Sequence, residues 1–200
     1  MNPSTTTTAG AIPVRLDPHR NSAAFWAAGT VPEEGFDGFG RAFPAEELGS
    51  FAEQLDLPSG WGHGTPDNIA CEGQLLTLEL PVSALGLELV GAGSGGTVAE
   101  TLRLLPAGTG DGPALDVRVE LSDFLSRRPA FQDSCAATAS FLYDIGGRAE
   151  YSVKPRLWRS RVEFAAPVAC GRIVLPVNPD LHLVGLWLLP APTRAGRSRR

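Results

Sequence analysis

Apolar residues alternate with polar ones over several short segments of the chain, and this period of two limits the fold more than any other feature. The pattern is clearest at Leu76–Leu80, Leu85–Leu89, Val117–Leu121 and Trp158–Phe164. Successive side chains of a β-strand point to opposite faces of a sheet, so each segment predicts a strand with one buried face. Ile173–Leu175 predicts a further short strand.

The stretches Gly91–Gly96 and Pro106–Pro113 are rich in glycine and proline, which indicates turns between these strands. The glycine run at 91–96 lacks the lysine and the helix start of a phosphate-binding loop. We therefore interpret it as a hairpin connection.

The segment Leu181–Leu189 is apolar on both faces apart from His182, which is typical of a strand in the middle of a covered sheet. We expect two buried faces, one with Leu183, Gly185, Trp187 and Leu189 and the other with Val184, Leu186 and Leu188. Several strands at this spacing, with few helices, predict an all-β fold of antiparallel β-sandwich type.

One helix is indicated near the start of the chain. Leu48, Phe51 and Leu55 recur at helical spacing after Pro44 and two glutamates, a proline and acids being common at helix starts. The segment Asp133–Leu142 is compatible with a second short helix or with a strand, and its pattern leaves both open. The sandwich should therefore contain one or two short helices.

The chain has 200 residues, 43% of them hydrophobic and 20% charged, which is enough for one domain with a single core. We expect a disordered N-terminal tail at 1–11, one β-sandwich domain at 12–190 and a flexible basic tail at 191–200. A net charge of -5 gives no general attraction for nucleic acid or anionic lipid. No secretory signal or membrane-spanning segment is visible, so we expect no membrane partner and a cytoplasmic location.

Cys71, Cys135 and Cys170 are odd in number and form no C-x-x-C pair. This spacing argues against a disulfide framework and against a zinc site, and we expect three free thiols. The isolated aspartates form no calcium motif, although they leave a structural calcium ion open. No metal and no cofactor are predicted.

The stretch from Phe36 to Pro44 predicts an ordered turn. Asp37 can accept backbone N–H groups, and Gly38 and Gly40 tolerate positive φ. Phe36, Phe39 and Phe43 should anchor the turn against the core. Asp37 then either caps the turn or faces a ligand.

The loop Pro58–Asn68 is too rich in glycine and proline for regular structure and carries Trp61, His63, Asp67 and Asn68. Loops of this kind often hold binding groups. The alternative is a wide turn in which Trp61 packs down on the sandwich while Asp67 and Asn68 satisfy local amides.

Four motifs occur in an order that resembles a known family. They are Phe36-Asp37-Gly38 with Gly40 and a helix after it, Pro66-Asp67-Asn68-Ile69 with Glu72-Gly73-Gln74 after it, Leu121-Ser122-Asp123-Phe124, and Leu181–Leu186. With them, the chain resembles over roughly residues 20 to 190 the galactose-binding-like jelly-roll modules at the C-terminal ends of actinobacterial glycoside hydrolases. The resemblance implies a jelly-roll β-sandwich with a carbohydrate-binding role.

Three functions follow from these features. The first is a stand-alone β-sandwich that binds a carbohydrate-like or glycosylated small molecule. The second is a cofactor-independent biosynthetic enzyme, such as a cyclase, dehydratase or isomerase. The third is a protein-interaction or homodimer sandwich, which needs only an exposed apolar sheet face.

One site serves the first two functions. We expect Asp37, His63, Asp67 and Asn68 to border one cavity, with Trp61 or Trp158 as an apolar wall. For an enzyme, the acid and base would come from His63, Asp67 and Asp37, with Tyr143 and His182 as further candidates. His182 is the weakest of these, because a lone histidine on a core strand is more often a structural residue.

Overall fold

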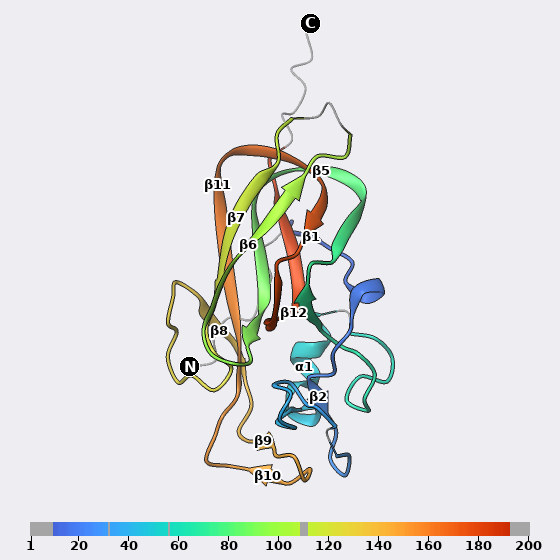
Figure 1. Ribbon diagram of the computed structural model, residues 1–200, viewed down its shortest axis with the longest axis vertical. Helices are drawn as coiled ribbons and strands as arrows, with labels where there is room; N and C mark the ends of the chain where they lie inside the picture. Colours follow the sequence, from blue (N-terminus) through green and yellow to red (C-terminus); the bar gives the residue numbers. More distant parts are fainter. Residues whose placement is uncertain (1–9, 32, 56, 109–111, 193–200) are drawn as a thin grey trace, which may run out of the picture.

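The structure is a computed structural model that describes residues 10–31, 33–55, 57–108 and 112–192. The tails expected at 1–11 and 191–200 lie almost entirely outside these ranges. The all-β antiparallel class is confirmed (Figure 1).

In the described ranges there is one α-helix, α1 (Ala45–Ala52), and a 3-10 turn, η1 (Asp17–His19). The strands are β1 (Ile12–Pro13), β2 (Phe25–Trp26), β3 (Phe43–Pro44), β4 (Ile69–Glu72), β5 (Leu75–Gly93), β6 (Val98–Leu105), β7 (Leu115–Leu121), β8 (Ser134–Thr138), β9 (Leu142–Tyr143), β10 (Ala149–Glu150), β11 (Arg156–Val174) and β12 (Val177–Pro190).

Eight strands form the main sheet in the order β1-β12-β5-β11-β6-β7, with β4 added to β12 and β8 added to β11. Its pairs are antiparallel, whereas the small pair β2 and β3 is parallel. The expected strands at 76–80 and 85–89 are two halves of the single strand β5. Those at 158–164 and 173–175 belong to β11, except for Leu175, which lies just beyond its end. The halves stay joined because register shifts within the β5–β11 pair absorb the irregular residues between them.

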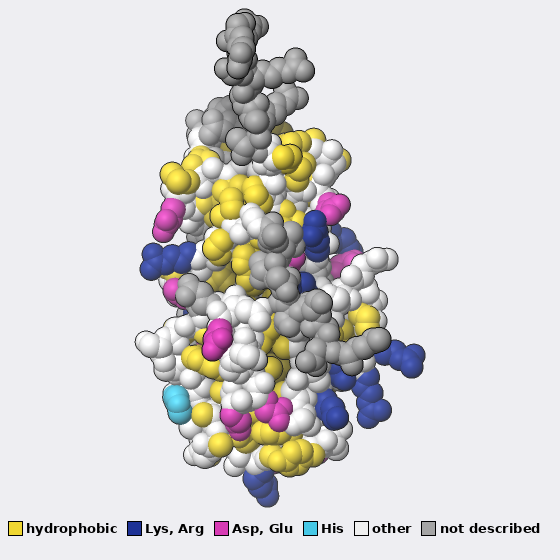
Figure 2. Space-filling view, turned by 180° about the vertical axis from the view of Figure 1, so that it is seen from behind, with side chains coloured by type: hydrophobic (Ala, Val, Ile, Leu, Met, Phe, Trp, Pro, Cys, Tyr) yellow, Lys and Arg dark blue, Asp and Glu magenta, His cyan; other side chains and the backbone are white. Residues whose placement is uncertain are grey.

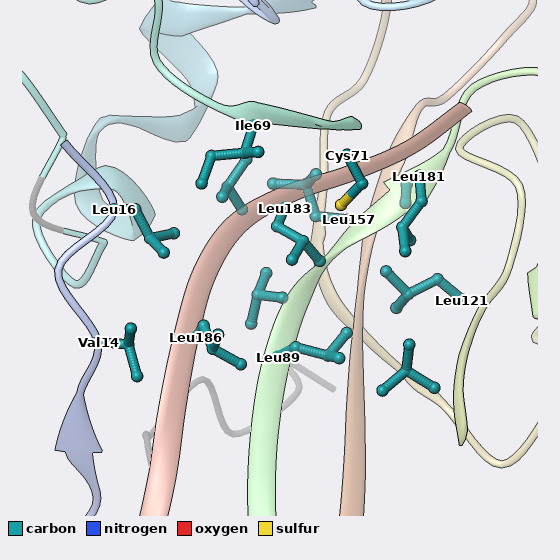
Figure 3. Close-up of a cluster of buried hydrophobic side chains, with 14 of the residues drawn as sticks. Val14, Leu16, Ile69, Cys71, Leu89, Leu121, Leu157, Leu181, Leu183 and Leu186 are labelled. Atoms are coloured by element: carbon teal, nitrogen blue, oxygen red, sulfur yellow. The ribbon is translucent and has the colours of Figure 1, made fainter. Parts of the chain in front are cut away.

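The β6–β7 hairpin forms a second layer. β6 pairs with β11 through its last residues, 103–105, whereas its earlier residues diverge from β11, so that the hairpin crosses in front of the sheet (Figure 1). As the alternation predicts, Val117, Val119 and Leu121 are buried, and they join the same core as Leu89. Figure 3 shows Leu121 and Leu89 beside residues of β12 in this core. Folding the hairpin over the sheet gives the sandwich its two layers.

Strand β12 is buried along Leu181–Leu189, as expected for a covered central strand. Its alternation is interrupted, however, because Leu183 pairs with Gly91 while Gly185 pairs with Val90. Neighbouring residues of β5 point to opposite faces, so Leu183 lies on the face opposite Gly185. The expectation that Leu183 and Gly185 share a face is therefore wrong, since the sequence pattern contains no sign of this bulge.

Hydrophobic side chains also reach the surface, and Figure 2 shows them gathered over the middle and upper part of the rear face. Leu80 is 77% exposed, although the alternation predicts that it points inward. The β5–β11 register jumps from Thr77 to Val82, so the residues between them have no partner in that pair. Without a fixed register, the alternation no longer decides which side chains are buried.

Helix α1 and the β2 and β9–β10 segments lie at the lower end of the sandwich (Figure 1). Leu48 and Phe51 are buried on the helix, as the helical spacing predicts, whereas Leu55 is buried in the turn that follows it. Residues 134–138, left open between helix and strand, form β8 against β11. Asp133 caps no helix there, because its carboxylate accepts hydrogen bonds from the backbone N–H and the hydroxyl of Ser122, at 2.7 and 3.0 Å.

The three cysteines, all of them in the described ranges, are unpaired. Cys71 and Cys170 are buried, and Cys135 is half-buried. In the same part of the chain, no helix has the length and apolar character needed to span a membrane.

Candidate functional site

A cleft of about 700 Å³ opens where several loops meet the start of β12. The segments around it are far apart in the chain, so only the fold brings them together. Its lining residues are Asn21, Ser22, Ala23, Trp26, Val31, Glu33, Glu34, Gly35, Phe36, Asp37, Gly38, His63, Gly64, Pro66, Ala70, Glu72, Ser94, Pro179, Asp180 and His182.

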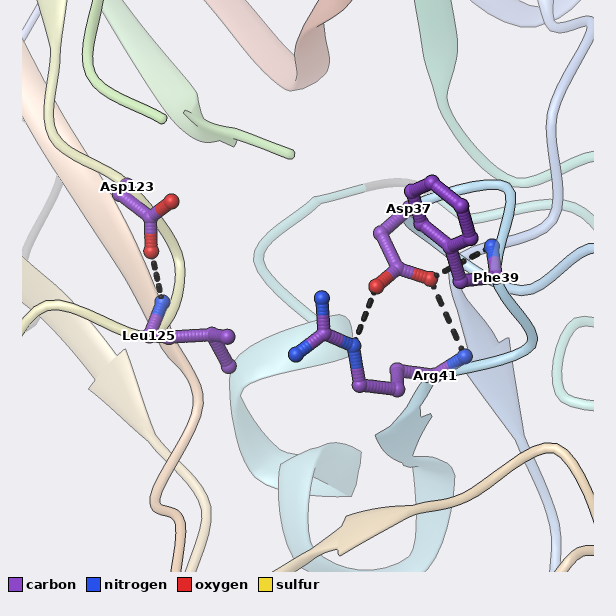
Figure 4. Close-up of polar contacts among 5 residues, drawn as sticks. All are labelled: Asp37, Phe39, Arg41, Asp123 and Leu125. Carbon is purple, nitrogen blue, oxygen red and sulfur yellow. Dashed lines mark hydrogen bonds and ion pairs between the residues drawn. The ribbon is translucent and has the colours of Figure 1, made fainter. Parts of the chain in front are cut away.

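Asp37 borders this cleft as a turn residue. Its carboxylate accepts the backbone N–H of Phe39 at 2.9 Å and of Arg41 at 3.1 Å, and it pairs with the Arg41 guanidinium (Figure 4). The Asp37 side chain is 0% exposed, against 39% for that of Arg41. Of the two interpretations, the structure therefore matches the turn cap. A carboxylate enclosed and neutralised in this way is a poor ligand for an incoming molecule.

The aromatic anchors of this turn are only partly as expected. Phe36 and Phe43 are buried and pack edge to face with ring centroids 5.1 Å apart, whereas Phe39 is 74% exposed. The tight return of the chain depends on Gly35, which has a φ of +67°. A Cβ there would lie 2.5 Å from the Arg41 carbonyl oxygen, so a larger residue would not fit.

Asp67 and Asn68 are fully buried behind the wall of the cleft and do not line it. The Asp67 carboxylate accepts the backbone N–H of Ala24 at 2.8 Å and of Phe25 at 3.2 Å. The Asn68 amide donates to the Ser22 carbonyl at 2.8 Å and to Asp67 at 3.1 Å. Burial raises the pKa of Asp67 to about 6, against the lowering effect of these hydrogen bonds. The pair satisfies backbone amides, as in the alternative given above, but these amides belong to Ala24 and Phe25 and not to the loop itself.

His182 enters the same network from β12 and does line the cleft. Its Nδ1 lies 2.7 Å from Asn68 Oδ1. Because the Asn68 nitrogen already donates to two oxygens, Oδ1 is the acceptor and Nδ1 of His182 carries the hydrogen. The other ring nitrogen, Nε2, is then a lone-pair acceptor, and it has no protein partner in the described part of the chain.

The charge state of His182 follows from its surroundings. Its side chain is largely enclosed, with the Phe36 ring centroid 4.3 Å from its own. Burial lowers the pKa of His182 to about 4, although the nearby charge of Asp37 acts in the opposite direction. The imidazole is therefore neutral near pH 7. It presents a hydrogen-bond acceptor at the wall of the cleft.

The aromatic wall comes from a residue that the sequence did not single out. Trp26 lines the cleft and is buried, and its Nε1 has no hydrogen-bond partner among the residues that the structure describes. Trp61 instead packs edge-on against Phe25, with ring centroids 5.6 Å apart. Trp158 is buried elsewhere and donates its indole N–H to the Asp123 carbonyl at 2.9 Å. Neither Trp61 nor Trp158 lines this cleft.

His63 is exposed and lines the cleft, as expected. Tyr143 does not line it, because its hydroxyl donates to Glu46 beneath helix α1. Burial and the Glu46 carboxylate raise the pKa of Tyr143 above its ordinary value. Of the proposed acid and base candidates, the structure brings Asp37, His63 and His182 to one cleft and gives only the two histidines unoccupied ring nitrogens.

Five further residues with amide or carboxylate side chains line the cleft, and sequence reasoning did not place them there: Asn21, Glu33, Glu34, Glu72 and Asp180. Asn21 bridges to β4, accepting the N–H of Ala70 at 2.8 Å and donating to Glu72 at 3.2 Å. Glu33 and Glu34 lie in an exposed bend, and Asp180 is an exposed residue near the start of β12. These residues belong to no local motif, and the Glu72-Gly73-Gln74 motif alone hinted at one of them.

Among the residues that the structure describes, no three His, Cys, Asp or Glu side chains converge as metal ligands. A second cavity, of about 820 Å³, lies between residues 12–20, the first half of β5 and residues 185–187. It is mainly apolar, and no predicted site residue lines it. The first cleft is therefore the better candidate for specific recognition of a polar ligand.

No protein-family model matches the chain, and no curated protein matches it either.

Proposed function

We propose that this protein is a stand-alone β-sandwich whose cleft binds a hydroxyl-rich, carbohydrate-like small molecule. The observation that carries the proposal is the convergence of hydrogen-bonding groups from separate segments: Asn21, Glu72, His63 and the unpartnered Nε2 of His182. All of them contribute acceptors, and Trp26 adds an apolar wall. The resemblance to galactose-binding-like modules supports the same class of ligand.

The chemistry of sugars explains why such a wall would suit them. A sugar hydroxyl donates one hydrogen bond, and a ring of carboxylate, amide and imidazole acceptors can receive several of these donors at once. A sugar ring also has faces of C–H groups that pack against an aromatic side chain. The cleft satisfies its buried amides internally, and within the described residues it leaves Nε2 of His182 without a partner, so that this atom can accept a hydrogen bond from the ligand.

The test is a titration of ¹⁵N-labelled protein with galactose and glucose, followed by two-dimensional NMR. The amide signals of the cleft residues Gly64 and Ser94 should move, while that of Gly49 in helix α1 should stay in place. Substituting His182→Phe removes the ring acceptor and should weaken binding about fivefold, the effect of one lost hydrogen bond. The matched control Trp61→Phe, which lies outside the cleft, should bind as the natural protein does.

Signals that move only outside the cleft, or a Trp61→Phe effect equal to that of His182→Phe, would contradict this proposal. Because the His182→Phe change leaves a buried Asn68 oxygen unpaired, its amide spectrum must first show the folded pattern.

A second candidate, a cofactor-independent isomerase or dehydratase, is favoured by the state of His182. A neutral imidazole whose Nδ1–H is held by Asn68 has Nε2 ready to accept a proton from a carbon or an oxygen. Such a base would reveal itself in D₂O, where an abstracted carbon-bound hydrogen is replaced by deuterium from solvent. Galactose and its ketose isomer tagatose, incubated with the protein, would then gain deuterium at the carbon beside the carbonyl group. If no deuterium is incorporated, His182 does not act as a base on this pair of sugars.

We also propose that the protein is located in the cytoplasm. Two buried thiols and one half-buried thiol, all unpaired, are what a reducing compartment permits. The carboxylates around the cleft also disfavour a phosphate-rich partner such as nucleic acid.

A further inference from the structure

The wall of the cleft is strongly one-sided in charge. Among the described residues, the lining includes no lysine or arginine but five carboxylates, those of Glu33, Glu34, Asp37, Glu72 and Asp180. A concave site lined by charges of one sign concentrates their field and raises the local concentration of ligands of opposite charge.

The five carboxylates are not equally available. Asp37 is neutralised by Arg41, and Glu72 accepts a hydrogen bond from Asn21. In the described part of the chain, the carboxylates of Glu33, Glu34 and Asp180 have no partner. These three residues are exposed and belong to two different segments, so their negative charge is available to a ligand from two sides.

A second observation, independent of the acidic residues, also points to a ligand. His182 is only 5% exposed, yet it lines the cleft and its Nε2 has no protein partner within the described ranges. Its hydrogen is held at Nδ1 by Asn68, so Nε2 can only accept. The group that completes it must therefore be an O–H or N–H donor.

The arrangement does not suit a bare metal ion. No three of the described His, Cys, Asp or Glu side chains come together as ligands, which means that the negative charge is spread around the wall. Spread charge and a separate acceptor fit a molecule that carries both a positive group and hydrogen-bond donors at several points. An ammonium group on a polyhydroxylated ring has this chemistry.

We propose that the cleft selects carbohydrate-like ligands that bear a protonated amine, of the amino-sugar class. The ammonium group would lie in the combined negative field of Glu33, Glu34 and Asp180, and a hydroxyl or amine N–H would donate to Nε2 of His182. This inference rests on the proposed function and narrows its ligand.

The experiment compares three sugars that share one ring: glucosamine, glucose and N-acetylglucosamine. Glucosamine is charged, whereas the other two are neutral. Followed by the amide signals of Gly64 and Ser94, glucosamine should bind about fivefold or more tightly than either neutral sugar at low salt, a modest gain for partly exposed charge pairs. Raising sodium chloride to 0.5 M should remove most of that preference.

Two variants test which carboxylates cause the preference for glucosamine. Glu34→Gln and Asp180→Asn each remove one unpaired charge without removing a structural hydrogen bond of the side chain, and each should reduce the preference for glucosamine. Glu53→Gln is the matched control, because Glu53 is an exposed residue outside the cleft and its loss changes the net charge equally. An equal effect of all three variants would overturn the proposal, since it would indicate attraction by overall charge alone.

A fourth probe, spermidine, separates this inference from the proposed function. Binding of glucose and glucosamine with equal strength would overturn the amine preference and leave carbohydrate binding in place. Binding of spermidine at the cleft without any sugar would refute carbohydrate binding while supporting a site for amines. If no probe moves the cleft signals, both proposals are wrong.

Discussion

At the scale of single residues, Asp67 and His182 are two titratable groups in one buried hydrogen-bond network, and their pKa values are shifted in opposite directions. Asn68 is hydrogen-bonded to both of them. Burial raises the pKa of Asp67 from 3.8 to about 6 and lowers that of His182 from 6.5 to about 4. Each shift exists because the interior disfavours the charged form of the group.

These shifts act on stability in opposite directions over the same range of pH. The folded protein binds a proton at Asp67 more readily than the unfolded chain does, so this group lowers stability as pH rises from about 4 to 6. At His182 the unfolded chain binds the proton more readily, so stability is lost as pH falls from 6.5 towards 4. Each effect is on the order of 3 kcal/mol, at about 1.4 kcal/mol per pKa unit.

Two substitutions should therefore separate what the natural protein combines. Relative to the natural protein, His182→Gln, which still offers an N–H to Asn68, should gain stability as pH is lowered from 6.5 to 4. Asp67→Asn should lose stability over the same interval. Thermal unfolding curves at four or five pH values would measure both, and differences from the natural protein that do not depend on pH would refute the assignment.

At the scale of secondary-structure elements, β12 and β5 allow the same substitution to be compared in two environments. Leu186 is 1% exposed in the core, whereas Leu80 lies outside it. Leu186→Ala should cost about 2–5 kcal/mol of unfolding free energy, the range for a cavity in a packed core. Leu80→Ala should change it by less than about 0.5 kcal/mol. Denaturant titration of both variants would decide, and equal losses would remove Leu186 from the core.

Helix α1 offers a change in the stabilising direction. Gly49 lies inside the helix, and a Cβ built on it meets nothing within 4 Å. Glycine inside a helix lowers stability by about 0.5–1 kcal/mol relative to alanine, because a glycine residue loses more conformational entropy on folding. Gly49→Ala should therefore raise the melting temperature, which calorimetry would show; a lower value would mean that the helix is not formed as described.

At the scale of the whole molecule, the three cysteines, all in the described ranges, are unpaired in the fold. Burial raises the pKa of Cys170 to about 11 and that of Cys71 to about 12, which suppresses their reactive thiolate forms. An alkylating agent should therefore label Cys135 first in the folded protein and all three thiols after unfolding. Mass spectrometry would count the labels, and fewer than three under denaturing, non-reducing conditions would reveal a disulfide.

The sequence predicted the class of fold because burial imposes local patterns. The alternation at Val117–Leu121, the apolar run at Leu181–Leu189 and the spacing of Leu48, Phe51 and Leu55 each depend on neighbours within a few residues. The bulge at Val184 and the joining of two halves into β5 depend on the register between strands far apart in the chain. No local pattern records such a register.

The candidate site was predictable to a smaller extent for the same reason. His63 and Asp37 lie in glycine-rich segments, which marked them as loop residues beside the cleft. Trp26, Glu72 and Asp180 gain their place only from the fold. Asp67 and Asn68 were expected at the cavity but lie behind its wall, because the backbone amides of Ala24 and Phe25 required buried acceptors.

The position of β12 in the sheet has a consequence for how the protein is made. This strand follows all other described strands in the chain, yet it pairs with β1, β4 and β5 and so lies between earlier segments. His182 and Asn68 are 114 residues apart in the sequence, and contacts of such long range form slowly during folding. During synthesis on the ribosome, β1, β4 and β5 therefore lack their common partner until β12 emerges and pairs with them. Completion of this cleft is thus tied to the final stage of folding.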